Sequence, residues 1–348
     1  MDLPRLTDVT CTRLGLCVVV AVLGVGFSNC RQEPGKPNPG AQVFGKIPAT
    51  LSRNWDKAWQ TKSLADRIRP IDATGIAYVA KWNELDGFEE KPEPAILDSA
   101  RRSALIKELE TLPPPVRSYI ERNVAAIFTT RALGGSAMAG LAYDDSGRPE
   151  FGFLIIDIDM FEKPANEWIT AKELTLFAPD AKQTFSIQIE DSAANTSTAG
   201  MRFILLHELG HIASQLNHTM PPFTETNLSV DSDFAKLSWT SAEMTRFDSQ
   251  FPERSRIKFY RRPPPFQMNS ASAIYDHLGK TDIATLYSCV DPHEDFAETF
   301  VLYVHSVLMG KHYIVRLHDS AGEHVLAKDR ILLSALAQKR KLVAEIFR

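Results

Sequence analysis

The chain has 348 residues, of which 44% are hydrophobic and 24% are charged, and its formal net charge at pH 7 is -4. This composition is typical of a globular protein that buries a full hydrophobic core, and it excludes a largely disordered chain. Because so small a net charge gives no broad basic field, we expect no nucleic acid partner.

Residues 1–29 have the pattern of a secretory signal peptide. Two arginines precede an uncharged apolar run over residues 14–27, which is shorter than the roughly 20 residues that span a bilayer. The sequence Phe-Ser-Asn-Cys30 is similar to the lipobox of bacterial lipoproteins, and this resemblance implies a lipid on Cys30. An uncleaved anchor and a plain signal peptide are the alternatives. Pro and Gly follow repeatedly, so we expect residues 30–48 to form a flexible tether.

This beginning predicts a protein of the bacterial cell envelope, anchored by lipid to the membrane and facing the periplasm or the exterior, or secreted if the lipobox is not used. Three of the four cysteines fall in the first thirty residues. The remaining chain therefore has no disulfide framework.

The next part of the chain mixes helical and strand patterns, and we expect residues 49–217 to form an N-terminal subdomain of helices and a small sheet. Apolar spacing predicts helices over 43–60, 94–112 and 116–128, and strands between turn signals at 134–135 and 144–147, over 151–161 and over 185–190. The strand over 151–161 is uniformly apolar, which indicates cover on both faces. The strand over 185–190 alternates, so it is either an ordinary sheet edge or an edge to which an extended peptide adds.

A metal-binding pattern, His207-Glu208-Leu-Gly-His211, lies in an apolar run with helical signals over residues 198–216. Residues four apart on a helix lie on one face, so His207 and His211 can both direct a ring nitrogen at one metal ion. Glu208 then lies beside the ion, where it can take a proton from a water molecule as general base. Two core histidines satisfied by hydrogen bonds are the alternative. The pattern predicts a zinc site.

A catalytic zinc needs a third protein ligand and leaves a fourth position to water. His218 is close in sequence, but Asn217 stands where the metzincin pattern has its third histidine. A better candidate is Glu294, on a helix that Asp291 can cap. Glu298 follows one turn later, so we expect Glu294 to bind zinc and Glu298 to accept the other ring N–H of a zinc histidine. An exposed acidic helix face is the alternative.

These motifs resemble those of the gluzincin metallopeptidases, and among them the anthrax lethal factor type of catalytic domain. The resemblance rests on the motif at 207–211, on Glu294-x-Phe-Ala-Glu298, and on Tyr287, seven residues before Glu294. It implies one Zn²⁺ per chain with Glu294 as the third ligand, and a peptide or protein substrate. It also implies that the Tyr287 hydroxyl hydrogen-bonds the oxyanion or assists the leaving amine. A core tyrosine is the alternative for Tyr287.

The chain after the histidine motif begins with a segment rich in Pro, Ser and Thr, so we expect a long irregular insertion over residues 218–286. A hairpin over 313–326 and a closing helix over 329–347 follow. We expect residues 218–348 to form a helical C-terminal subdomain. The whole chain is then predicted to have an α+β, zincin-like fold with a cleft between the two subdomains.

The sequence therefore predicts a zinc-dependent peptidase tethered at the cell envelope. The alternative is a non-catalytic lipoprotein that uses a zincin scaffold as a binding module. In that case the zinc is structural, and His218 or Cys289 closes the fourth position. Nothing in the sequence indicates an oligomeric state.

Overall fold

The structure is a computed structural model that describes residues 46–223 and 229–348. The helices are α2 (Leu64–Arg67), α3 (Ala73–Asp86), α4 (Ser99–Glu110), α5 (Pro114–Asn123), α6 (Ala165–Leu174), α7 (Ser197–Leu216), α8 (Ala271–Gly279), α9 (Pro292–Leu302) and α10 (Ala337–Glu345). The strands are β1 (Ile68–Pro70), β2 (Glu93–Pro94), β3 (Val124–Arg131), β4 (Ala137–Tyr143), β5 (Pro149–Asp157), β6 (Phe177–Ala178), β7 (Thr184–Gln188), β8 (Phe266–Gln267), β9 (Ile314–Asp319) and β10 (Gly322–Lys328). The predicted α+β class is thereby confirmed.

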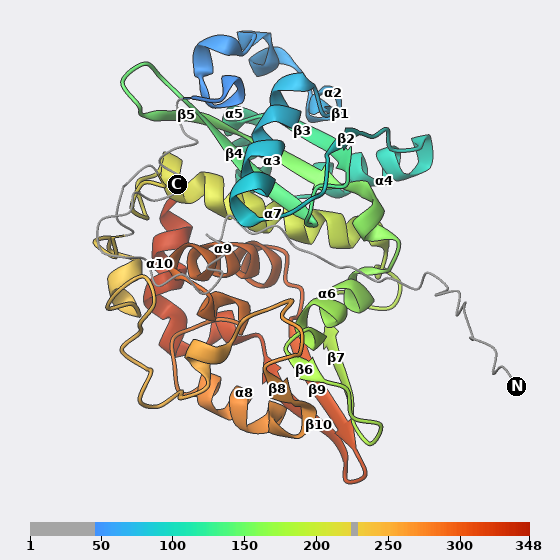
Figure 1. Cartoon of the computed structure of the whole chain (residues 1–348), viewed down its shortest axis with the longest axis vertical. Helices are drawn as coiled ribbons and strands as arrows, with labels where there is room; N and C mark the ends of the chain where they lie inside the picture. The colour runs from blue at the N-terminus through green and yellow to red at the C-terminus, as the bar shows by residue number, and fades with distance from the viewer. Residues whose placement is uncertain (1–45, 224–228) are drawn as a thin grey trace, which may run out of the picture.

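The larger sheet has the order β1-β3-β5-β4, with β2 paired to the end of β3. Strands β1, β3 and β5 run parallel, and β4 runs antiparallel to β5. Helix α3 covers one face, where Tyr78 packs edge-on against Phe153 at a ring distance of 5.2 Å. Helix α7 covers the other face (Figure 1). Leu154 and Ile156 belong to the core cluster on that face. The strand predicted over 151–161 is β5, covered on both faces as expected, but it ends at Asp157 and residues 158–161 form a 3₁₀ turn.

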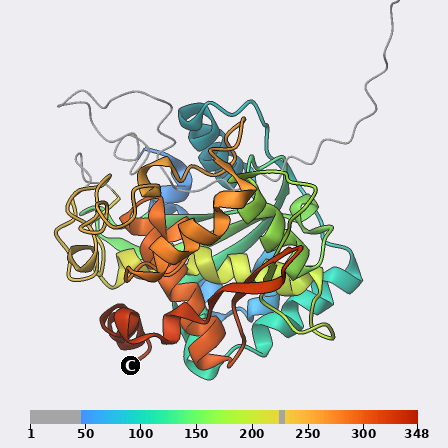
Figure 2. The ribbon, with the colours of Figure 1, turned by 90° about the horizontal axis from the view of Figure 1, so that it is seen from below.

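The elements that follow α7 gather on the side of this helix away from the larger sheet (Figures 1 and 2). They include α8 to α10 and the β9–β10 hairpin, which confirms the hairpin predicted over 313–326. Strand β7 joins this hairpin to make a three-stranded antiparallel sheet in the order β10-β9-β7. Its buried side chains, Phe185 and Ile187, alternate with more exposed ones, as predicted. Among the described strands β7 pairs with β9 alone, so it is a sheet edge.

The helix predicted over 43–60 is wrong for the part that the structure describes. Residues 48–50, 52–54 and 57–61 form three separate 3₁₀ turns. Leu51 is extended between two of them because it pairs with Tyr143 at the edge of β4. The two tryptophans whose spacing suggested a helix both pack on the ring of Phe151. The ring centres of Trp55 and Trp59 lie 5.6 and 5.1 Å from the ring centre of Phe151. Tertiary packing overrides the local spacing here.

The helix predicted over 116–128 is right only to Asn123, where α5 ends and β3 begins. The Arg67 guanidinium marks this end, because its Nη1 donates to the carbonyls of Glu121 and Val124 at 2.8 and 2.7 Å. The closing helix is also shorter than predicted. Residues 330–332 and 334–336 form 3₁₀ turns before α10.

The predicted signal peptide, Cys30 and most of the tether lie outside the described residues. Within 46–223 and 229–348, no helix combines the length and the apolar character that crossing a bilayer requires. The division into subdomains at residues 217 and 218 stays a prediction.

Candidate metal centre

Helix α7 is buried on all sides, because it lies between the larger sheet and the elements that follow it. Every residue from Thr198 to Gln215 is buried, which explains why the helix is apolar all round rather than amphipathic. Its ends are fixed by side chains. The hydroxyl of Thr196 accepts from the Ala199 N–H at 3.1 Å, and the Asn217 amide donates to the Ala213 carbonyl at 2.9 Å.

Helix α9 lies directly against α7. It begins as predicted, since the Asp291 carboxylate accepts from the N–H of His293 and Glu294 at 2.8 and 2.9 Å. Gly210 permits the close approach, because a Cβ added there would lie 3.0 Å from Ala297 Cα. This is shorter than an ordinary van der Waals contact. The two backbones therefore approach at a point one turn from the Glu294 side chain.

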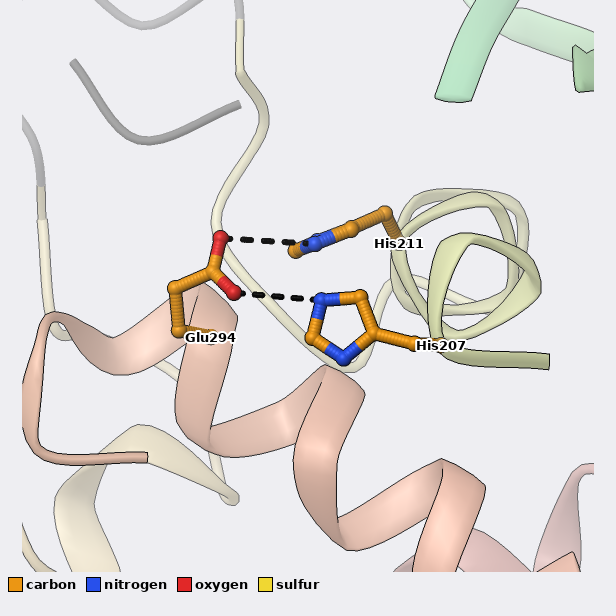
Figure 3. Close-up of side chains that lie close together, drawn as sticks. All are labelled: His207, His211 and Glu294. Atoms are coloured by element: carbon orange, nitrogen blue, oxygen red, sulfur yellow. Dashed lines mark ion pairs between the residues drawn. The ribbon is translucent and has the colours of Figure 1, made fainter. Parts of the chain in front are cut away.

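The approach brings His207, His211 and Glu294 into one cluster, which could hold a metal ion (Figure 3). Glu294 Oε2 lies 3.2 Å from His207 Nε2, and Oε1 lies 3.4 Å from His211 Nε2. One donor atom from each residue lies within 4.8 Å of the other two. Bonds of about 2.0–2.1 Å in a tetrahedral site set neighbouring donors roughly 3.3 Å apart. The two nitrogen-to-oxygen distances fit that spacing.

The charges in the cluster also favour a cation. Burial raises the pKa of Glu294, but the neighbouring histidines outweigh burial and hold this pKa well below its usual range. Burial lowers the pKa of His207, yet Glu294 and Glu298 outweigh it and raise the pKa to about 10. The carboxylates thus attract a proton onto His207 when no ion is bound. A divalent cation bound between these residues would supply the positive charge that the carboxylates attract.

Glu298 lies where the sequence suggested, one turn along α9 from Glu294. Its Oε1 is 3.0 Å from His207 Nδ1, the ring nitrogen that faces away from Glu294. Its Oε2 accepts a hydrogen bond from the Thr285 hydroxyl at 2.7 Å. At this distance the carboxylate is close enough to orient the imidazole of His207.

Glu208 and Tyr287 each bring an unused polar atom to this region. Oε2 of Glu208 and the hydroxyl of Tyr287 are buried and have no hydrogen-bond partner among the described residues. Burial raises the pKa of Glu208, and it raises that of Tyr287 well above the ordinary value. The ring of Tyr287 lies 5.8 Å from that of His207. Both side chains are available to a molecule that enters the centre.

The other candidate ligands lie elsewhere. His218 is exposed in the turn after α7, and the Cys289 thiol is buried with its sulfur 3.8 Å from the Thr285 carbonyl. Within the described part of the chain, neither belongs to the cluster of metal donors. The cluster thus offers three protein ligands.

Two residues near the centre have no counterpart in the sequence prediction. The Phe223 ring lies 4.5 Å from that of His293 and 6.2 Å from that of His211. Lys172 of α6 lies beside Glu298. The signal that could have indicated Lys172 is its spacing, because it shares a helix face with the core residues Trp168 and Ile169.

The centre is closed in this conformation. His207, Glu208, His211 and Glu294 each expose 2% or less of their surface. The narrow space beside His211 leaves no room for a water molecule among the residues that line it, which are Tyr78, Ala139, Gly140, Leu141, Ile212 and Phe223. Access from solvent therefore requires a side chain such as Phe223 to move.

No protein-family model, no curated protein and no solved structure matches this chain.

Proposed function

We propose that this protein is a zinc-dependent peptidase with a zincin-like fold, similar to the gluzincins, and that it is anchored by lipid at the cell envelope. One observation carries the proposal. Glu294 meets both histidines of the helical motif at distances that suit a tetrahedral metal site, although 82 residues lie between it and His211 in the sequence.

The donor set favours zinc over the other common divalent ions. Two imidazole nitrogens and one carboxylate suit a borderline-soft ion, whereas Mg²⁺ and Ca²⁺ prefer sites made of oxygen alone. His207, His211 and Glu294 would hold the zinc and leave one position open. A bound zinc supplies Lewis acidity, which polarises a carbonyl and lowers the pKa of water.

The chain's own groups supply the rest of the chemistry. Glu208 accepts a proton from the attacking water, because its Oε2 is unpartnered, and it returns that proton to the leaving nitrogen. The Tyr287 hydroxyl donates a hydrogen bond to the oxyanion that forms on the substrate. Glu298 keeps the imidazole of His207 in the orientation that binds the ion.

The substrate would enter along β4. This strand is at the edge of the larger sheet and packs against α7, so an extended peptide can add by backbone hydrogen bonds to the part of it before Tyr143, where Leu51 already pairs. Ala139 and Gly140 of β4 line the narrow space beside His211, which places this edge at the centre. A peptide must displace the Phe223 ring, which lines the same space.

The closed centre favours one other candidate function, a binding module in which the zinc is structural. The Glu208→Gln variant separates the two. For a peptidase, purified residues 31–348 cleave a mixed peptide library, and the variant loses cleavage while it retains about one zinc per chain. Cleavage by the variant at the wild-type rate would refute the role of Glu208. A wild-type protein that binds zinc and cleaves no peptide would favour the binding module.

A further inference from the structure

Lys172 is a buried lysine that touches two parts of the proposed centre. It exposes only 2% of its surface, and its Nζ lies 3.4 Å from Glu298 Oε1. The same Nζ lies 3.5 Å from the centre of the Tyr287 ring. A lysine is rarely so deeply buried unless it has a partner. Here the partners are a carboxylate and an aromatic face, both of which lie beside His207.

The carboxylate of Glu298 is held from two sides. Thr285 donates to Oε2, and Lys172 contacts Oε1, the same oxygen that faces His207 Nδ1. Without Lys172 the buried carboxylate would face His207 with no countercharge of its own. Removal of one partner of a buried ion pair is strongly unfavourable, so Glu298 would change its position or its charge.

The charge of Lys172 also sets the balance of the whole centre. Three buried carboxylates, Glu208, Glu294 and Glu298, surround His207, and Lys172 neutralises one of them. On the Tyr287 side, the ammonium lies over the ring face, where the negative charge of the π-system attracts it and holds the ring in place.

We propose that Lys172 is a positioning residue for the metal centre, which acts through Glu298 on His207 and through the ring of Tyr287 on its hydroxyl. This inference rests on the proposed metal site and goes beyond it, since Lys172 touches none of the three metal donors. It assigns a role to α6 beyond its packing against α7, β6 and β7.

The test is a double-mutant cycle on zinc affinity, measured by competition with a chromogenic chelator. Lys172→Met and Glu298→Gln should each weaken zinc binding about tenfold, which is the lower end for groups that support a metal ligand. If Lys172 acts through Glu298, the double variant should also be weakened about tenfold, rather than a hundredfold. The absorption spectrum of the Co²⁺-loaded protein should change in both single variants.

Lys339→Met is the matched control. Lys339 is also a buried lysine, with its Nζ 2.6 Å from Asp295 Oδ2 and 5.2 Å from the Phe234 ring, but it makes no contact with Glu298 or Tyr287. We expect this variant to lose stability and keep the wild-type Co²⁺ spectrum.

Zinc binding by Lys172→Met at wild-type affinity would overturn the inference, and so would losses that multiply in the double variant. If Lys172→Met does not fold, the double variant, which removes both charges, still tests whether Lys172 acts through Glu298. A zinc affinity equal to that of Glu298→Gln alone supports the inference, and a further tenfold loss refutes it. A wild-type protein that binds no zinc would refute the metal site and this inference together, whereas the cycle alone can refute the role of Lys172.

Discussion

Gly210→Ala perturbs the metal centre without replacing any group that we expect to touch the ion. The new Cβ would lie 3.0 Å from Ala297 Cα, 3.1 Å from Phe300 Cβ and 3.3 Å from the Ala297 carbonyl oxygen. Two of these atoms belong to the α9 backbone, which cannot rotate away as a side chain can. Helix α9 must therefore move by about 0.5 Å to restore ordinary contacts.

The displacement has two consequences that can be estimated. Overpacking costs about 1–3 kcal/mol, and alanine in place of glycine returns about 1 kcal/mol of helix propensity, so the free energy of unfolding should fall by about 0–2 kcal/mol. Metal sites tolerate ligand displacements of only about 0.2 Å. Glu294 moves with α9, so we expect zinc affinity to fall about tenfold or more.

The assay combines urea unfolding of the metal-free protein with a competition titration for zinc. Gly200→Ala on the same helix is the control, because its Cβ would lie 3.5 Å from Ala165 Cα and from Phe161 Cδ1, an ordinary contact. This control should gain up to about 1 kcal/mol and bind zinc as the wild type does. Equal zinc affinity in the two variants would refute the claim that the α7–α9 contact sets the ligand geometry.

Three further results are expected. Zinc binding at pH 7.5 should release about one proton, because the pKa of His207 is raised to about 10 in the metal-free centre; calorimetry in buffers of different ionisation enthalpy measures it, and no release would contradict the described charges. Burial raises the pKa of Glu173 to about 7, so the folded state keeps a proton that the unfolded chain releases above about 4.5. This carboxyl should therefore lower the free energy of unfolding by about 3 kcal/mol between pH 4.5 and 7, and in urea unfolding the loss for Glu173→Gln over this range should be smaller than the wild-type loss by about that amount. An equal loss in the two proteins would contradict it. Phe223→Ala should speed the loss of zinc to a chelator, and an unchanged rate would mean that another group closes the centre.

The parts of the centre that depend on neighbours in sequence could be predicted from the sequence. The spacing of His207 and His211 on one helix, the Asp291 cap and the alternation in β7 are local properties, and the structure has each of them. The same local reasoning failed at Trp55 and Trp59. Their spacing fits a helix, but long-range packing on Phe151 places them on 3₁₀ turns.

The remaining features depend on which elements meet in space. The sequence around Gly210 does not show that it permits the close approach of α9. Only the packing of α9 against α7 would make a Cβ at this position clash. The spacing of Lys172 indicates a buried face of α6, but its partner Glu298 could not be predicted because the ion pair joins residues 126 positions apart. Phe223 comes from a segment with no periodic pattern, and its cover of His211 follows from tertiary structure alone.

The central claim is that Glu294 completes a zinc site with His207 and His211. Metal analysis of purified residues 31–348, after dialysis against a limiting zinc buffer, tests it most directly when wild type and Glu294→Gln are compared. We expect about one zinc per chain for the wild type and a large loss for the variant, with both proteins folded. Equal zinc content in the two proteins, or a wild type without zinc, would contradict it.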